Sequence, residues 1–217
     1  MSNAMDIARK LIDGGITHSH ILQDMGECGQ NNPHHYGSVW EHTLDVIHVI
    51  DSMEENGTNL HPYMYVAGLL HDCGKPYIKG INPKTGFDTF YGHEKLSAAL
   101  AEYIIKTDDE FKYMSHDDIE FVCKLIKHHD LSMHMTITGE GDKYNLPVTS
   151  QNVQKRIDEF KLTKYELINL LYLCEADIMA QSKVAKIGNL TTTRKDKLAV
   201  VNAIRRVMED NNLQYCE

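Results

Sequence analysis

The chain has 217 residues, of which 42% are hydrophobic and 24% are charged, and its formal net charge is −9. This length and composition suit a globular fold with its own core and exclude a disordered or fibrous chain. The excess of Asp and Glu argues against binding of long nucleic acids, which needs clustered Lys and Arg.

The first half of the chain is predicted to consist of helices joined by loops. Residues 1–4 resemble the remnant of an expression tag, and we expect one domain over residues 5–217. Ser38 and Glu41 form a capping-box pattern at a helix start, while Gly74 and Pro76 are expected to end a helix that begins at Pro62. The predicted helices cover residues 6–13, 19–27, 38–56, 62–71 and 92–106, and a turn-rich loop covers residues 79–91.

The second half continues the helical pattern. Weak alternation over residues 133–138 is compatible with one short strand. We find no internal repeat and no interdomain linker, so the predicted fold class is all-α, a single-domain helical bundle. The further predicted helices cover residues 116–129, 149–160, 163–183 and 191–210.

Cysteine usage and hydropathy indicate a cellular compartment. The five cysteines contain no C-x-x-C pair, which disfavours a disulfide framework or a zinc ribbon and is typical of a reducing cytosol. No apolar run approaches the ~18 residues of a membrane-spanning helix. We therefore expect a cytoplasmic protein without membrane contact, and the sequence leaves its oligomeric state open.

Histidine is unusually frequent, with 13 residues against 10 Met and 5 Phe. A single histidine on an apolar face is most often a hydrogen-bonded core residue. Here, however, His42, His128, His129 and Asp177 lie on the apolar stripes of three different predicted helices. A buried carboxylate needs a base or a metal ion as partner, and inward-facing polar groups on several helices can form one site in a bundle core.

Two further elements point to metal chemistry. His71 and Asp72 follow the apolar end of a predicted helix, and His93 opens the next one. The two oxygens of Asp72 could bridge metal ions about 3.5–4 Å apart, the spacing of two-metal hydrolytic sites.

These residues and their neighbours resemble the HD-domain superfamily of metal-dependent phosphohydrolases. Its pattern His…His-Asp…Asp is matched by His42, His71-Asp72 and Asp177. The resemblance covers about residues 30–183 and is strongest to the HD domain found beside the transferase domain of bacterial tRNA CCA-adding enzymes. The transferase half has no match, so we expect a stand-alone HD domain with its metal site in the bundle core. The segments that carry the resemblance are residues 36–44, 67–76, 90–94 and 175–181.

The resemblance implies a set of metal ligands. Mixed imidazole and carboxylate ligation favours one or two ions of Mn, Fe, Co, Ni or Zn over Mg or Ca. His128 stays open as an alternative to His129, because both follow the same apolar run. The first ion would be held by His42, His71, Asp72 and Asp177, and the second by Asp72, His93 and His129.

The resemblance also implies a reaction. A metal-activated water would attack the phosphorus of a small phosphate ester, a nucleotide or a 2′,3′-cyclic phosphodiester. Asp72 and Lys75 are the expected catalytic residues, and Lys75 would bind a phosphate oxygen. Glu94, His34 and His35 are candidates for the pocket wall, and Cys73 is interpreted as a packing residue.

Two other functions remain open from the sequence. Some HD-fold enzymes resemble this ligand set and are di-iron oxygenases, which cleave carbon bonds with dioxygen. A non-catalytic nucleotide-binding module that keeps the metal for its structure is the other alternative; a structural site would be closed, whereas a catalytic site keeps an open position.

Overall fold

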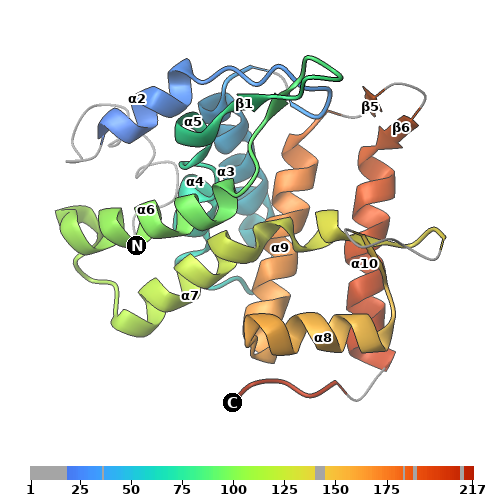
Figure 1. The fold of residues 1–217 in the computed structure, drawn as a ribbon. Coiled ribbons are helices and arrows are strands. Elements are labelled where there is room, and N and C mark those ends of the chain that lie inside the picture. Colours follow the sequence, from blue (N-terminus) through green and yellow to red (C-terminus); the bar gives the residue numbers. More distant parts are fainter. Residues whose placement is uncertain (1–18, 36, 140–144, 183, 188–189, 211–212) are drawn as a thin grey trace.

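The structure is a computed structural model, and it describes residues 19–35, 37–139, 145–182, 184–187, 190–210 and 213–217. It is mostly helical (Figure 1), which confirms the predicted all-α class. The predicted helix over residues 6–13 lies outside the described residues. The described helices are α2 (Ser19–Glu27), α3 (Val39–Glu55), α4 (Met64–Leu70), α5 (Lys75–Ile78), α6 (His93–Thr107), α7 (His116–His128), α8 (Ser150–Phe160), α9 (Lys164–Ala180) and α10 (Arg194–Asp210).

Capping residues define where the principal helices begin. The Ser38 hydroxyl accepts a hydrogen bond from the Glu41 backbone N–H at 3.2 Å, and the Glu41 carboxylate accepts one from Ser38 N–H at 2.7 Å. The predicted capping box of α3 is therefore confirmed. The same reciprocal pattern begins α7 at Ser115 and α9 at Thr163, because a side-chain oxygen satisfies an N–H that has no partner within the helix.

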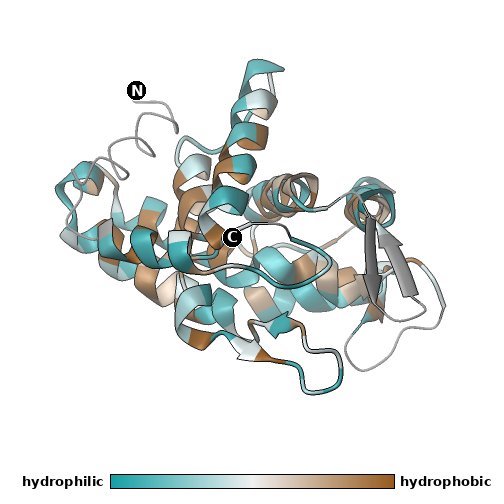
Figure 2. Ribbon diagram, turned by 90° about the horizontal axis from the view of Figure 1, so that it is seen from above, coloured by the Kyte–Doolittle hydropathy of each residue, from teal (hydrophilic) through white to brown (hydrophobic). Residues whose placement is uncertain are grey.

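Helix α9 forms the centre of the bundle. It is buried on most of its circumference, from Leu167 to Ile178, as expected of a helix that is apolar on nearly all sides. Helices α3, α4, α7 and α10 pack against it, and α6 packs against α7 (Figure 1). Apolar residues lie between the helices and polar residues face outward (Figure 2). No described helix has the length and apolar character needed to cross a membrane.

Three two-stranded ribbons connect the helices in the described part of the chain. Strands β1 and β2 are antiparallel, with Gly80 opposite Thr89, and β5 and β6 are antiparallel. Strands β3 and β4 are parallel, with Met135 opposite Leu146. The strands are β1 (Gly80–Ile81), β2 (Asp88–Thr89), β3 (Met135–Thr136), β4 (Leu146–Pro147), β5 (Val184–Ile187) and β6 (Leu190–Thr193).

Two predicted helix boundaries near the prolines were wrong. Helix α4 begins at Met64, two residues after Pro62, because residues 62 and 63 form a turn ahead of it. Pro76 does not close a helix; it lies in the first turn of the short helix α5. A proline is tolerated there because the N–H that it lacks would have had no helical partner.

Two predicted loop or helix segments were also wrong in part. The loop over residues 79–91 contains the β1–β2 hairpin, whose strands are too short for alternation to reveal. The helix predicted from residue 191 begins at Arg194, since Thr193 accepts from the Asp196 N–H at 3.1 Å and so caps α10. The preceding threonines belong to β6, as expected of β-branched residues.

Candidate metal centre

Six buried side chains meet at one end of the bundle, each less than a tenth exposed. They come from helix ends and the turns beside them. His42 lies in the first turn of α3 and Asp177 near the end of α9. The others are His71 and Asp72 in the turn after α4, His93 as the first residue of α6, and His129 directly after α7.

Two glycines set the start of α6 against the turn that carries His71 and Asp72. Gly92 has φ +84°, a left-handed conformation that favours glycine, and His93 follows it as the first helical residue. Gly74 donates its N–H to the Ser97 hydroxyl at 2.9 Å. A Cβ at Gly74 would lie 2.7 Å from the Ser97 backbone nitrogen, so only glycine permits this close approach.

Three of the histidines are oriented by the same local hydrogen bond. The Nδ1 atoms of His71, His93 and His129 donate to the backbone carbonyls three residues earlier, at 2.7, 2.9 and 2.7 Å. A carbonyl oxygen can only accept, so Nδ1 carries the proton. When such a ring is neutral, its Nε2 keeps a free lone pair, as in metal-ligating histidines.

The two oxygens of Asp72 face different pairs of histidines. Oδ2 lies 3.2 Å from His71 Nε2 and 3.7 Å from His42 Nε2. Oδ1 lies 3.1 Å from His93 Nε2 and 3.8 Å from His129 Nε2. One carboxylate is thus shared between two imidazole pairs, the arrangement that a bridging ligand requires.

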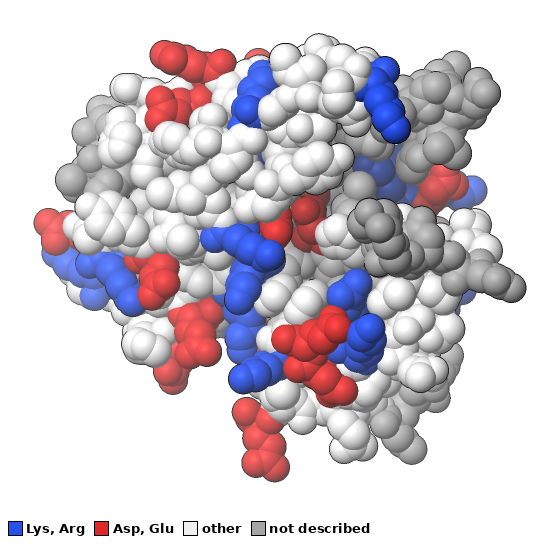
Figure 3. All heavy atoms as spheres, viewed as in Figure 1, with Lys and Arg blue, Asp and Glu red and all other residues white. Residues whose placement is uncertain are grey.

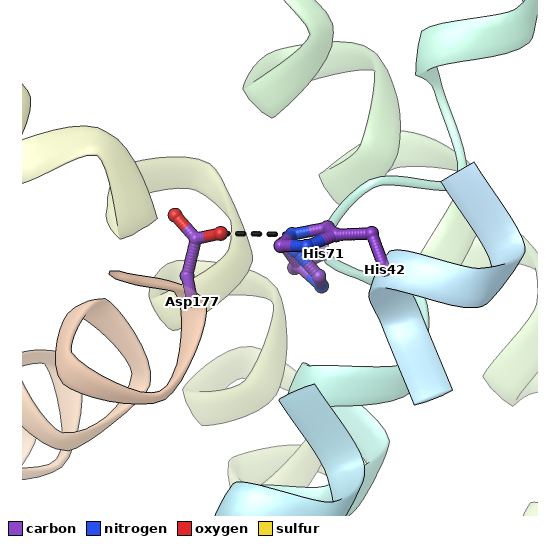
Figure 4. A group of neighbouring side chains, drawn as sticks. All are labelled: His42, His71 and Asp177. Carbon is purple, nitrogen blue, oxygen red and sulfur yellow. Dashed lines mark ion pairs between the residues drawn. The ribbon is translucent and has the colours of Figure 1, made fainter. Parts of the chain in front are cut away.

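Asp177 completes the first half of the cluster. Its Oδ1 lies 2.9 Å from His42 Nε2, and the two side chains approach each other from α9 and α3 above His71 (Figure 4). Its Oδ2 accepts a hydrogen bond from Gln181 Nε2 at 3.1 Å. The ligand atoms of His42, His71 and Asp177 all lie within 4.8 Å of one another.

The cluster fits divalent metal ions. Ligand atoms about 2.1 Å from one ion and at right angles are separated by roughly 3 Å, close to the shorter distances observed here. Both ring nitrogens of His42, Nε2 of His71 and both oxygens of Asp72 are buried without a partner in hydrogen-bonding geometry. The Nε2 atoms of His93 and His129 lie 3.1 Å apart, a distance that either a shared proton or a metal ion between the two nitrogens would satisfy.

The carboxylates in the cluster stay ionised. Burial raises the pKa of Asp72, but the charges of His71 and Lys75 outweigh burial and hold its pKa well below the usual value. Burial likewise raises the pKa of Asp177, and His42 more than offsets it. Burial lowers the pKa of His129, which Asp130 only partly opposes. The site therefore offers two carboxylates and at least one neutral imidazole to a metal ion.

Lys75 contacts the same cluster from α5. Its Nζ lies 2.7 Å from Asp72 Oδ2, donates to Gln30 Oε1 at 3.1 Å, and lies 5.4 Å from the centre of the Phe90 ring. The residue is only 5% exposed. A lysine of this kind is a fixed positive charge beside the cluster.

The structure separates the remaining sequence candidates. Glu94 lies 3.7 Å from His93 Nδ1, and the His35 ring lies edge-on to His42 at 4.5 Å, so both adjoin the cluster. His128 faces away and stacks on Phe160, with ring centres 3.8 Å apart. It therefore does not join the other candidate ligands.

Cys73 packs in the core rather than facing the cluster. It is fully buried, and its thiol contacts the Ser97 carbonyl at 3.6 Å. Burial raises the pKa of the thiol far above its usual range, so a reactive thiolate is disfavoured.

Three neighbouring residues were missed in the sequence analysis. Asp130 Oδ1 lies 3.7 Å from His129 Nε2, and its position next to His129 in the chain was the available signal. Gln181 follows Asp177 by one helical turn, which could have identified it. Lys197 reaches the site from α10, and its position in the sequence gives no indication of this.

A pocket of about 770 Å³ opens over the cluster. Asp72, His93 and Asp177 contribute to its lining, as do Lys75 and Lys197. The aromatic residues Phe87, Phe90 and Tyr91 form part of the wall, together with Met133. Three of the six candidate ligands thus line a pocket that opens to the outside, as a catalytic site requires.

Comparisons with known proteins agree with the resemblance seen in the sequence. The chain is 32% identical over 71 residues to an A-adding tRNA nucleotidyltransferase from Deinococcus radiodurans. The match covers 33% of this chain but only 16% of that relative's length, so the relative's activity does not transfer with it. The model of the HD domain family matches residues 39–180, more than half of the chain and a segment that contains all six candidate ligands. The chain therefore belongs to the HD domain family.

Proposed function

We propose that the protein is a metal-dependent phosphohydrolase that cleaves a small phosphate ester, either a nucleotide or a 2′,3′-cyclic phosphodiester. One observation carries this proposal: Asp72 is buried between two pairs of histidine Nε2 atoms, with a different oxygen facing each pair. Membership of the HD domain family supports the hydrolase class.

The chain's own residues would prepare the site. His71, His93 and His129 hold their Nε2 lone pairs toward the centre through the backbone carbonyls that fix Nδ1. Lys75 offers an ammonium beside Asp72 that can bind a phosphate oxygen. Bound divalent ions would supply a water of lowered pKa and positive charge for the phosphate oxygens.

The pocket supports a ligand of nucleotide size. Its volume of about 770 Å³ lies within the range of small-molecule sites. Phe87, Phe90 and Tyr91 supply aromatic faces in the pocket wall, on which a base could stack. On the face shown in Figure 3, basic and acidic side chains are intermixed, which supports a small ligand over a long polyanion.

Metal analysis combined with a phosphoester screen tests the proposal. We expect protein purified without added metal to retain Mn, Fe, Co, Ni or Zn, and to release phosphate from a nucleotide or open a cyclic phosphodiester. Removal of the metal with a chelator should abolish turnover, and re-addition should restore it. A metal-loaded protein that is inert across nucleotides, cyclic nucleotides and sugar phosphates would contradict the proposal.

Substitution of the bridging residue gives a sharper test. Asp72→Asn should lower turnover by more than ~100-fold, since even outer-shell changes at metal sites cost about 10–100-fold. The matched control is Asp158→Asn, which changes an exposed aspartate on α8 and should leave turnover unchanged. Equal turnover of Asp72→Asn and the wild-type protein would exclude the two-metal interpretation.

The same preparations separate the alternatives left open by the sequence. Hydrolysis that proceeds without dioxygen and with Mn or Zn excludes a di-iron oxygenase. Nucleotide binding without turnover in the metal-loaded protein would favour a non-catalytic module.

A further inference from the structure

Lys197 enters the pocket from a part of the chain that the family match does not cover. It lies in the first turn of α10, which packs beside α9 (Figure 1), and it lines the pocket together with Asp72 and Asp177. His34, from the loop before α3, lies against it. Both residues fall outside residues 39–180, the segment that matches the HD domain family. This part of the pocket wall is therefore formed by residues outside the family match.

The ammonium of Lys197 contacts only neutral groups among the described residues. It donates to Gln181 Oε1 and to His34 Nδ1, the latter at 3.0 Å. No described carboxylate lies within ion-pair distance of it, whereas Lys75 in the same pocket is paired with Asp72 at 2.7 Å. Burial of an ammonium without a paired carboxylate is costly. Burial lowers the pKa of Lys197, and the carboxylates of Asp177 and Asp130 oppose this only in part, so an anionic ligand in contact with Lys197 would reduce that cost.

His34 adds a second donor at this place. Since an ammonium can only donate, Nδ1 of His34 accepts and its ring proton is on Nε2. Burial, followed by the charge of Lys197, lowers the pKa of His34 to about 4, in keeping with a neutral ring near pH 7. Lys197 and His34 together therefore present a positive charge and an N–H donor in one pocket wall.

We propose that Lys197 and His34 form an anion subsite that binds the phosphate group of the substrate beside the candidate metal centre. The inference rests on the proposed function for the identity of the ligand. It assigns to α10 a role in substrate binding. The phosphate group would then be bound by two ammonium groups, those of Lys75 and Lys197.

A purely structural role for Lys197 makes a different prediction. Gln181 contacts Lys197 through Oε1 and donates through Nε2 to Asp177 Oδ2 at 3.1 Å. Lys197 could thus serve only to hold Gln181, and through it the orientation of Asp177. In that case loss of Lys197 would weaken metal binding, with phosphate affinity falling only as a consequence.

Binding of inorganic phosphate to the metal-loaded protein, measured by titration calorimetry, distinguishes the two roles. Lys197→Met should weaken phosphate binding by at least ~10-fold, the usual effect of one hydrogen bond to a charged group, with unchanged metal content. Lys197→Arg should keep most of the affinity. Lys195→Met, which removes the same charge from an exposed position on α10, is the matched control and should bind as the wild type does.

A second measurement uses only the wild-type protein and so does not depend on folding of a variant. Phosphate should slow acetylation of Lys197, followed by mass spectrometry, and leave that of Lys195 unchanged. The subsite is overturned if phosphate protects neither lysine or both equally, if Lys197→Met binds phosphate as tightly as the wild type, or if that variant loses metal in proportion to phosphate.

These outcomes are independent of turnover. If the wild-type protein binds phosphate through Lys197 but hydrolyses no ester, the proposed function fails and the subsite stands. If it hydrolyses esters while Lys197→Met leaves phosphate affinity unchanged, the subsite fails and the function stands.

Discussion

The ionised state of the buried Asp72 carboxylate depends on the residues around it. It is 1% exposed and has Lys75 and four histidines around it. Its ionised form is stable because these neighbours outweigh the effect of burial on its pKa. The neighbours in turn depend on Asp72 for their counter-charge.

We therefore expect Asp72→Asn to destabilise the metal-free protein. The change leaves the buried ammonium of Lys75 without a carboxylate, and removal of one partner of a buried ion pair costs about 3–5 kcal/mol. Urea unfolding of chelator-treated protein measures this loss, with Asp158→Asn as the control at an exposed site. Equal unfolding midpoints for the two variants would show that the ion pair of Asp72 and Lys75 does not stabilise the metal-free protein.

His128 gives a prediction for the pH dependence of stability. Burial, followed by nearby lysines, lowers its pKa from 6.5 to about 4. As the pH falls below 6.5 the unfolded chain takes up a proton that the folded ring cannot, so stability is lost between pH 6.5 and 4. His128→Phe keeps the stacking on Phe160 without a titrating group. It should therefore lose less stability than the wild type between pH 7 and 4.5.

Urea unfolding at several pH values, on protein treated with a chelator, tests this comparison. Parallel pH profiles for the wild type and His128→Phe would contradict the assignment of the shift to His128.

At the scale of elements, the site depends on how closely α6 approaches the turn after α4. Gly74 makes this approach possible, because any side chain there would meet the backbone of α6. The start of α6 in turn positions His93. Small changes in this contact should therefore affect both the free energy of unfolding and the position of His93, a candidate ligand of the second ion.

Gly74→Ala should destabilise the protein by about 1–3 kcal/mol, the usual cost of overpacking, and lower the amount of metal bound per chain. Gly26→Ala is the matched control, because a Cβ there meets nothing within 4 Å and alanine favours the helix by ~0.5–1 kcal/mol. Urea unfolding and metal quantification read out both effects. If Gly74→Ala were destabilised but bound the normal amount of metal, the close contact at Gly74 would not be needed for metal binding.

Sequence reasoning located most helices but not the elements between them. The capping box at Ser38 and the apolar periodicity are local signals, so the bounds of α3 were predicted closely, as was the start of α9, which ends at Ala180 where the prediction reached residue 183. The β1–β2 hairpin and the start of α10 were missed. Strands of two to four residues carry too little pattern, and their pairing is set by contacts that are distant in sequence.

At the scale of the whole molecule, metal binding should be coupled to folding. The cluster joins α3, α6, α9 and the turns after α4 and α7, so a bound ion would hold together elements from across the chain. A ligand present at 100 times its Kd stabilises the folded state by about 2.7 kcal/mol.

We accordingly expect Mn, Co or Zn to raise the Tm of chelator-treated protein by about 5–10 °C, and Mg or Ca to have a smaller effect. His42→Ala should abolish most of this shift. His48→Ala, which removes an exposed histidine from the same helix, should retain it. Thermal melts across the metal series provide the measurement, and identical shifts in both variants would place the bound metal elsewhere.

The fold class, the family and the residues most suited to a metal site could all be predicted from the amino-acid sequence. The fold class and the candidate residues follow from local signals: helical periodicity, caps, and ionisable residues on faces that must be buried. The family follows from the resemblance of short segments around the His and Asp residues. The roles of these six residues as ligands remain a prediction that the structure supports by bringing them together.

Which histidines share a site, and which residues surround them, depends on how the helices pack. His128 and His129 are adjacent in sequence, but the end of α7 turns one toward Phe160 and the other toward Asp72. Lys197 and His34 are 163 positions apart and meet because α10 packs beside α9. Contacts of this kind depend on the packing of whole helices, which the periodicity of a single segment does not specify.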